Sequence, residues 1–360
     1  MLADPSPKCL SWKKLVAESV VHPGQLPRRL AADRAVADAA ARNFPMRVNP
    51  YFLSLIHSPD DPLGRQVIPS SAELAGNNLS LDPLAEELQS PVAQVIHRYP
   101  GRVVFLVSDQ CAVHCRFCMR RRNVFKGRGV SSGALEEGLA YIRGQGRINE
   151  VILSGGDPLM LDDDRLDALL LKLSQIQHVR VLRIHTRVPC VLPQRITPHL
   201  VRRLTRFQPL YINIHFNHPS EISAAAEQAC TLLIDAGIVL GSQTVLLKGV
   251  NDHEDVLHDL MQRLLQVRIR PYYLHQLDHV AGATHFEVPL ERSLALVGSL
   301  RGRLSGLAVP HFMVDLPGGG GKVALLPDSV QSRDGGQWLI RNWQGRFFAY
   351  TEMAQAYKEK

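Results

Sequence analysis

Between about residue 101 and residue 275 the chain alternates short apolar segments typical of strands with amphipathic segments typical of helices. In the helical segment 164–173, leucines recur at positions i, i+3, i+4 and i+7, a spacing that buries one helix face. Strands that alternate with helices pair in parallel through right-handed crossovers. The pattern therefore predicts an α/β fold built on a parallel sheet. The predicted strands are 103–107, 150–153, 179–185, 210–216, 238–246 and 270–275, with further helices at 220–236 and 252–267.

The number of strand–helix units indicates how far this sheet closes. Six units are too few for a closed eight-stranded barrel, so we expect an open, partial (β/α)6 TIM-like barrel. Functional side chains of such barrels gather at the C-terminal ends of the strands. We assign residues 96–300 to this core and residues 301–360 to a C-terminal segment. Residues 1–95, with helices predicted at 12–20, 30–41 and 84–96, are interpreted as a helical cap or oligomerisation arm without catalytic residues.

Three cysteines follow the first predicted strand directly. Cys111, Cys115 and Cys118 have the spacing C-x3-C-x2-C. Three thiolates on a short loop can hold three irons of a [4Fe–4S] cluster, whereas electron-transfer clusters usually have four protein ligands. The fourth iron would then be open to a small molecule. This spacing is similar to that of the radical S-adenosylmethionine (SAM) enzymes.

Other interpretations of these cysteines remain. A structural zinc site needs four ligands, and His114 lies inside the first gap, where its geometry would be poor. The remaining cysteines, Cys9, Cys190 and Cys230, are isolated, so there is no second cysteine pair. Scattered cysteines in a chain without a signal peptide argue against a disulfide framework. Buried free thiols are the third alternative.

A glycine motif ends the second predicted strand. Gly155 and Gly156 would let the backbone approach a ligand closely, and Asp157 adds a carboxylate that can hold the ammonium group of an amino acid. The alternative is a simple glycine turn into a helix. Its place one strand–helix unit after the cysteine loop favours a ligand-binding role.

A second glycine run, 317–322, is not a P-loop. The GxxxxGK[ST] pattern needs glycine where Leu316 stands and serine or threonine where Val323 stands. Its backbone N–H groups could still cradle a phosphate. Lys322 at its end could bind pyridoxal phosphate (PLP) as a Schiff base. A flexible surface loop with a solvated lysine is the alternative.

Two further groups have chemistry that suits charged ligands. Arg98, Tyr99 and Arg102 suit a phosphate, because guanidinium groups match its oxygens, although surface arginines are common. Asp278 and Asp315 lie in apolar contexts near the expected barrel mouth. As a pair they could receive a substrate ammonium group, and either one could instead cap a turn.

The charge of the chain bears on its partners. With 41 Lys and Arg against 34 Asp and Glu, the net charge is +7. The charge is spread apart from residues 120–122, so we expect anionic small molecules rather than nucleic acid, with an RNA- or protein-binding role as the alternative. The N-terminal residues contain no long apolar run, so neither a secretion signal nor a membrane span is expected. The predicted location is the reducing cytoplasm.

Taken in order, seven motifs resemble the lysine 2,3-aminomutase family of PLP-dependent radical SAM enzymes over about residues 95–350. The resemblance implies a [4Fe–4S] cluster, SAM and PLP as cofactors, and an external one-electron reductant such as flavodoxin or ferredoxin. It also implies a homo-oligomer that interconverts L-lysine and β-lysine through a 5′-deoxyadenosyl radical. The motifs are RYPGRVVFLVSDQCAVHCRFCMRRR, SGGDPL, RIHTRVPCVLPQRIT, INIHFNHPSEI, SQTVLLKGVND, YYLHQLDHVAGATHF and VDLPGGGGK.

The same resemblance implies a role for each matching residue. The three cysteines would ligate the cluster, the glycine motif would help to hold SAM, and Lys322 would carry PLP. Arg120 would pair with the substrate carboxylate. The remaining implied residues are His215 and Gln243 beside SAM, Arg98, Tyr99 and Arg102 on PLP, and Asp278 and Asp315 on the distal ammonium group of lysine.

The chain departs from the long lysine aminomutases in one respect. Those enzymes carry a C-terminal extension with zinc-binding cysteines, and no cysteine follows Cys230 here, so the resemblance does not lead us to expect a zinc-dependent tetramer. In length the chain is similar to the short branch that isomerises lysine for β-lysylation of elongation factor P. The intact VDLPGGGGK segment is instead similar to the enzymes of free lysine. A related amino-acid 2,3-aminomutase and a partner-coupled elongation factor module remain alternatives.

Overall fold

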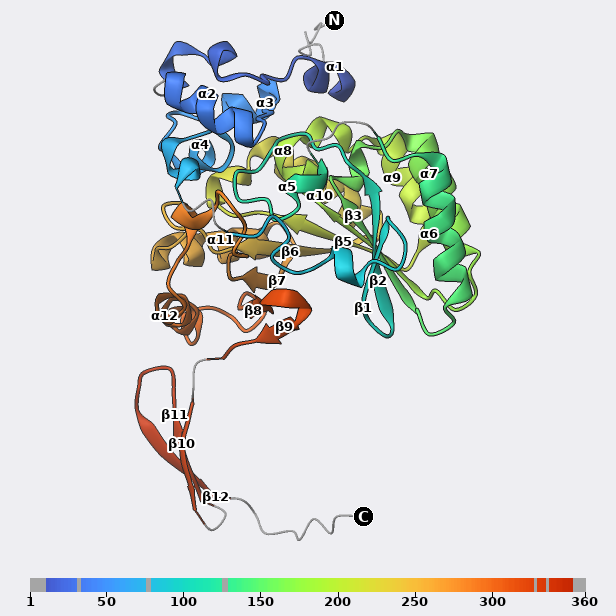
Figure 1. The fold of residues 1–360 in the computed structure, drawn as a ribbon. Helices are drawn as coiled ribbons and strands as arrows, with labels where there is room; N and C mark the ends of the chain where they lie inside the picture. Colours follow the sequence, from blue (N-terminus) through green and yellow to red (C-terminus); the bar gives the residue numbers. More distant parts are fainter. Residues whose placement is uncertain are drawn as a thin grey trace, which may run out of the picture.

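A computed structural model describes residues 11–30, 34–75, 79–124, 129–326, 329–334 and 337–351. Its centre is a nine-stranded sheet in the order β1 to β9, curved into an open barrel (Figure 1). Strands β2 to β8 are parallel, and the edge strands β1 (Val95–Tyr99) and β9 (Gly321–Ala324) are antiparallel to their neighbours. The parallel strands are β2 (Arg102–Ser108), β3 (Glu150–Gly155), β4 (Val181–Thr186), β5 (Leu210–His215), β6 (Val239–Val245), β7 (Arg270–His275) and β8 (His311–Leu316).

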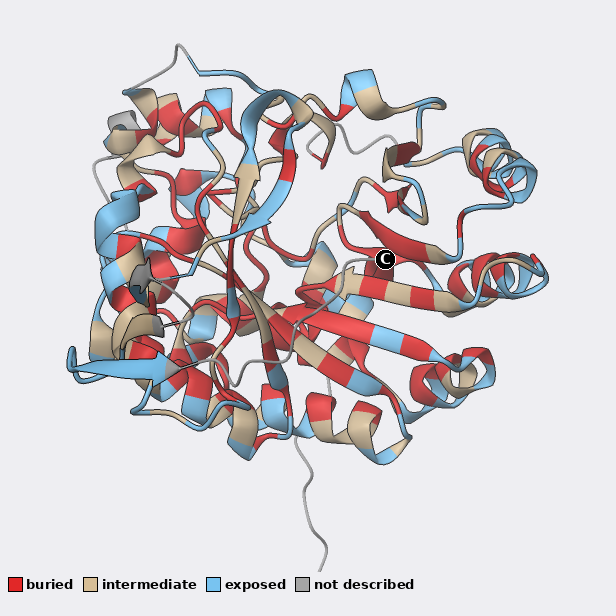
Figure 2. Ribbon diagram, turned by 90° about the horizontal axis from the view of Figure 1, so that it is seen from below, coloured by how far each residue is buried: buried red, intermediate tan, exposed pale blue. Residues whose placement is uncertain are grey.

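The predicted partial parallel barrel is confirmed, and all six predicted strands form. The sheet continues further than expected, because β8 and β9 pair onto β7 although they lie in the segment that was assigned outside the barrel. Helices cover the outer face of the sheet, and Figure 2 shows buried strands beneath helices whose outward faces are exposed. The covering helices include α6 (Ser132–Gly144), α7 (Asp163–Ser174), α9 (Pro198–Leu204), α10 (Ala224–Asp235), α11 (Glu254–Gln266) and α12 (Leu290–Leu300).

Helix α7 shows how the predicted pattern becomes packing. Leu166, Leu169, Leu170 and Leu173 are all buried in the main hydrophobic core, as their spacing predicts. Each buried leucine contributes about 1.5–3 kcal/mol relative to an exposed one.

Among the described residues, no helix combines the length and the apolar character needed to cross a bilayer.

The N-terminal segment packs against the cysteine loop. Val48 forms a β-bridge with Val113, and the buried guanidinium of Arg116 pairs with Glu73 at 2.5 Å. The helix predicted at 84–96 is wrong: only the short 3-10 turn η4 (Glu87–Gln89) forms, and β1 begins at Val95. The helices that do form are α1 (Trp12–Ala17), α2 (Arg34–Asn43), α3 (Pro50–Ser54) and α4 (Pro62–Val67).

The glycine run 317–322 brings the two edges of the barrel together. Gly318, Gly319 and Gly321 all have positive φ, in a turn between β8 and β9. A Cβ atom on Gly319 would lie 2.4 Å from Nε2 of Gln89, so the Gln89 amide would have to move. Beyond the turn, the backbone N–H of Lys322 donates to the Tyr99 hydroxyl of β1 at 2.8 Å. The run therefore forms a hydrogen-bonded seam with β1, although most of its residues are exposed.

Replacing Gly319 with alanine should destabilise the protein. A positive φ of 86° costs a residue with a Cβ about 1–2 kcal/mol, and the contact with Gln89 adds to this strain. We expect a lower midpoint of thermal unfolding by a few degrees. Gly306→Ala is the matched control, because a Cβ there meets nothing within 4 Å. Equal midpoints for the two variants would contradict the seam.

A separate three-stranded antiparallel sheet follows the barrel and lies to one side of it (Figure 1). The short strands predicted up to Tyr350 are thereby confirmed. The sheet exposes Phe347, Phe348 and Tyr350, and Trp343 is exposed in the turn before its last strand. Its strands are β10 (Val330–Asp334), β11 (Gln337–Arg341) and β12 (Phe347–Thr351).

Candidate active site

Two adjoining cavities lie inside the barrel. The smaller, about 230 Å³, is lined by the cysteine loop and the glycine motif after β3, and the larger, about 720 Å³, extends down the lumen to Lys322. Every site residue predicted from the sequence lines at least one of the two. The residues that line both are Met119, Arg120, His185, Asn213, His215, Gln243, Val245 and Asp278.

The cysteine loop presents three free thiols to the smaller cavity. Cys111, Cys115 and Cys118 all line it, and burial raises the pKa of the Cys118 thiol to about 11. Neutral thiols of this kind become ligands when a metal takes their protons. In the described part of the chain, no set of three or more His, Cys, Asp or Glu residues converges as a single metal ion requires. Three thiols around an open cavity fit an iron–sulfur cluster better than a zinc ion.

His114 takes no part in this cavity. Its Nδ1 atom lies 3.0 Å from the carbonyl oxygen of Pro45, and burial lowers the pKa of the imidazole to about 4. The side chain therefore faces the N-terminal segment. This removes the fourth ligand of the zinc alternative. Of the isolated cysteines, Cys190 and Cys230 are buried, and Cys9 lies outside the described residues.

The glycine motif packs against the cysteine loop. Gly155 has φ 116°, and a Cβ on it would lie 2.3 Å from the carbonyl oxygen of Ser108. A Cβ on Gly156 would lie 2.5 Å from the carbonyl oxygen of Gln110. Only glycine fits at both positions, so the end of β3 comes close enough for both segments to wall one cavity.

Asp157 lines the smaller cavity, and the protein itself holds its carboxylate. Its carboxylate accepts hydrogen bonds from the Thr186 hydroxyl at 2.7 Å, the Arg187 backbone N–H at 2.7 Å and the Leu159 backbone N–H at 3.0 Å. Burial raises its pKa, against these hydrogen bonds, which favour the charged form. With its oxygens engaged by the protein, Asp157 ties the end of β3 to the end of β4 and shapes the cavity wall.

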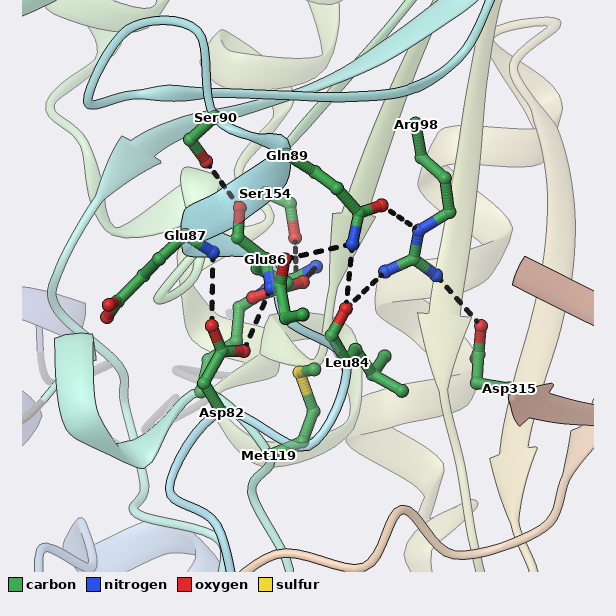
Figure 3. Close-up of polar contacts among 12 residues, drawn as sticks. Asp82, Leu84, Glu86, Glu87, Gln89, Ser90, Arg98, Met119, Ser154 and Asp315 are labelled. Carbon is green, nitrogen blue, oxygen red and sulfur yellow. Dashed lines mark hydrogen bonds and ion pairs between the residues drawn. The ribbon is translucent and has the colours of Figure 1, made fainter. Parts of the chain in front are cut away.

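The larger cavity holds the residues predicted for PLP. The Lys322 ammonium group pairs with Asp315, whose Oδ1 lies 3.4 Å from Nη1 of Arg98 (Figure 3). The guanidinium of Arg102 lies over the Tyr99 ring, 4.1 Å from its centroid. Arg98, Tyr99 and Arg102 thus come together beside Lys322, as a phosphate-bearing coenzyme with an aldehyde would require.

Comparison with known proteins decides the family. The model described as "Lysine-2,3-aminomutase" matches residues 297–360, and "Radical SAM superfamily" matches residues 105–261. The chain is 44% identical to L-lysine 2,3-aminomutase of Clostridium subterminale over 313 residues, which is 85% of this chain and 75% of that one. The chain belongs to the lysine 2,3-aminomutase family of radical SAM enzymes. The resemblance read from the seven motifs is confirmed.

Two other members of this family are informative. L-lysine 2,3-aminomutase of Escherichia coli K12 is 37% identical over 337 residues, covering 91% of this chain and 97% of that one. Glutamate 2,3-aminomutase of Clostridioides difficile is 40% identical over 306 residues, covering 84% of this chain and 72% of that one. The cofactors of the family are a [4Fe–4S] cluster, SAM and PLP, and the two cavities contain residues that fit each of them.

Sequence reasoning missed several residues of the lumen. His185, Asn213 and His275 line it from β4, β5 and β7, and burial lowers the pKa of both histidines well below its usual value. All three lie near the C-terminal ends of predicted strands, a signal that could have identified them. Glu86 also lines the lumen, although it lies in the part of the chain that was expected to carry no chemistry. Its segment was predicted as a helix, and no local pattern identified it.

Proposed function

We propose that this protein interconverts L-lysine and β-lysine by moving the amino group between C2 and C3. The observation that supports lysine best is the pair Asp278 and Asp315, which line one lumen together with Lys322. Two carboxylates suit a substrate with a distal ammonium group and would repel the distal carboxylate of glutamate. When bound, the cluster and SAM supply a hydrogen-abstracting radical, and PLP carries the migrating amino group.

Each end of the substrate has a residue of opposite charge. Arg120 would hold the α-carboxylate, and the two aspartates would hold the ε-ammonium group, so that one Cβ hydrogen faces the smaller cavity. In the structure the Lys322 ammonium group pairs with Asp315. Once the Lys322 amine is engaged by PLP, Asp315 becomes available to the ammonium group of the substrate.

The wall between the cavities would separate the cofactors. His215 and Gln243 line both cavities and would contact SAM from the side of the lumen. Cys111, Cys115 and Cys118 would hold the cluster, and Gly155 and Gly156 would let the backbone approach SAM. Arg98, Tyr99 and Arg102 would bind the PLP phosphate.

The proposal extends to partners. Turnover needs an external one-electron reductant, for which flavodoxin or ferredoxin is suitable. The exposed aromatic residues of the β10–β12 sheet support a homo-oligomer, because contiguous exposed apolar surface marks interfaces. We propose a cytoplasmic location, where a reduced cluster persists. The length of the chain, similar to that of the short branch, leaves elongation factor P maturation as the alternative setting for the same reaction.

Anaerobic turnover tests the function. Protein reconstituted with iron and sulfide would be incubated with SAM, PLP, dithionite and L-lysine, and the products separated on a chiral column. We expect β-lysine, and no β-glutamate when L-glutamate replaces lysine. If a sample with an intact cluster and bound PLP formed no β-lysine, the proposal would be wrong.

Lysine binding should strengthen as pH rises through about 7. Burial, and then the negative charge of Asp315, raises the pKa of Asp278 to about 7, while Lys322 lowers it. Below this pKa Asp278 is neutral and cannot pair with the ε-ammonium group, and above it the pair forms. The measurement is the lysine dissociation constant across this range, from the absorbance of bound PLP. In Asp315→Asn the midpoint should move to lower pH, and an unmoved midpoint would assign the titration to another group.

A further inference from the structure

Residues 80–90, which we call the strap, cross the barrel mouth ahead of β1 (Figure 3). The carbonyl oxygen of Ser80 accepts from the Ala281 N–H at 3.1 Å, and that of Pro83 accepts from the Gly318 N–H at 3.3 Å. Further along, the carbonyl oxygen of Leu84 accepts from Nη2 of Arg98 at 3.1 Å. The strap is therefore bonded to the loop after β7, to the glycine turn and to β1.

One strap side chain, Glu86, enters the lumen and meets Arg120. Its Oε1 atom accepts from Nε of Arg120 at 3.0 Å and from Nη2 at 2.7 Å. The Glu86 side chain is only 5% exposed. Its backbone is fixed as well, because the Asp82 carboxylate accepts from the Glu86 and Glu87 N–H groups, each at 3.0 Å. The position of the Glu86 backbone is thus fixed by contacts that do not involve Arg120.

A second contact reaches Arg120 from the barrel itself. The Ser154 hydroxyl, at the end of β3, accepts from Nη1 of Arg120 at 3.1 Å. A guanidinium group has five N–H bonds, one on Nε and two on each terminal nitrogen. Glu86 and Ser154 engage three of them, so one N–H on Nη1 and one on Nη2 have no partner among the described residues. A carboxylate binds such a pair of N–H groups in parallel.

We infer that Glu86 is a positioning residue that, together with Ser154, orients the Arg120 guanidinium so that its remaining N–H pair receives the α-carboxylate of the substrate. This inference rests on the proposed function. Orientation of Arg120 by Glu86 can be distinguished from simple neutralisation of its charge, because removing Glu86 changes carboxylate binding in opposite directions in the two cases. If Glu86 only neutralised Arg120, its removal would leave a stronger cation and tighter carboxylate binding. If Glu86 orients Arg120, its removal weakens carboxylate binding.

The test compares two ligands on holoenzyme with bound PLP. L-Lysine carries the carboxylate, and L-lysinamide has the same side chain and amine without it. Dissociation constants come from the absorbance change of PLP, with no SAM or reductant present. In Glu86→Gln we expect the constant for lysine to rise roughly 10-fold or more, as for a lost hydrogen bond to a charged group, and that for lysinamide to stay the same. A merely structural defect would weaken both ligands alike.

Two further variants complete the design. Glu87→Gln is the matched control, because Glu87 pairs with Arg122 and its side chain is 73% exposed, and we expect wild-type values for both ligands. Ser154→Ala removes the second tether without touching the strap and should also reduce discrimination between lysine and lysinamide. Should Glu86→Gln fail to bind PLP, Glu86→Asp decides, because it keeps the charge and withdraws the carboxylate from Arg120.

The outcomes distinguish failure of the orienting role of Glu86 from failure of the proposed lysine substrate. Suppose that wild-type protein discriminates between lysine and lysinamide. If Glu86→Gln, or its substitute Glu86→Asp, then discriminates equally well or binds lysine more tightly, the orienting role of Glu86 is overturned. Wild-type protein whose PLP absorbance responds to neither ligand would instead overturn lysine as the substrate.

Discussion

Replacing Lys322 with alanine should abolish β-lysine formation, by on the order of 10⁴-fold or more, as when a covalent catalytic group is removed. In the proposed function, PLP needs only the amine of Lys322. The backbone N–H that bridges to Tyr99 is kept in the variant, so the seam between β9 and β1 stays closed. PLP content and its absorbance would be measured after gel filtration, beside the iron content of the same sample. We expect loss of the lysine-bound PLP spectrum with the cluster intact.

Lys248→Ala controls for the loss of any lysine. Lys248 is exposed and lines neither cavity, and its backbone N–H donates to the carbonyl oxygen of Phe286. This variant should keep full PLP content and turnover. A Lys322→Ala protein that still bound PLP with an unchanged spectrum would show that another amine carries the coenzyme, and the larger cavity would need a different interpretation.

The elements that could be predicted are those in which the apolar residues of the sequence pattern are also the residues buried in the structure. Helix α7 buries all four of its predicted leucines. The helix predicted at 84–96 failed because the apolar spacing there does not mark a buried face: Leu88 is 90% exposed. Strand β8 was missed for a related reason, because its apolar run is short and ends at Asp315. Its pairing with β7 is a tertiary contact that no local pattern encodes.

The site divides in the same way. The cysteines, the glycines and Lys322 sit in contiguous motifs whose spacing carries the chemistry. Glu86 is recognisable only after folding brings the strap onto Arg120, 34 residues away in the chain. The hydrogen bonds of Asp157 were also beyond sequence, since residue type alone cannot show that Thr186 donates to its carboxylate. Motifs thus predicted the groups that we propose meet the cofactors, and tertiary contacts showed the groups that hold those side chains in place.

The pair of aspartates should decide which amino acid is used. Asp315→Asn removes one of two buried charges from the proposed ammonium site, and we expect kcat/KM for lysine to fall by roughly 10²–10³-fold, the cost of breaking a buried charge pair. The side chain of Asp315 is only 4% exposed, so solvent replaces little of the lost interaction. The measurement is kcat/KM under anaerobic turnover, with PLP content determined on the same sample.

L-Norleucine, which has the lysine side chain without its amine, separates charge recognition from damage to the lumen. Wild-type protein should bind lysine much more tightly than norleucine, and this preference should decrease in Asp315→Asn while norleucine affinity is unchanged. The exposed Asp255→Asn is the control. Because Asp315 raises the pKa of Asp278, its replacement leaves Asp278 more fully charged at neutral pH, so one carboxylate persists and the loss is partial. Undiminished preference for lysine in Asp315→Asn would mean that the ε-ammonium group binds elsewhere, since a neutral amide cannot replace the carboxylate as its counter-ion.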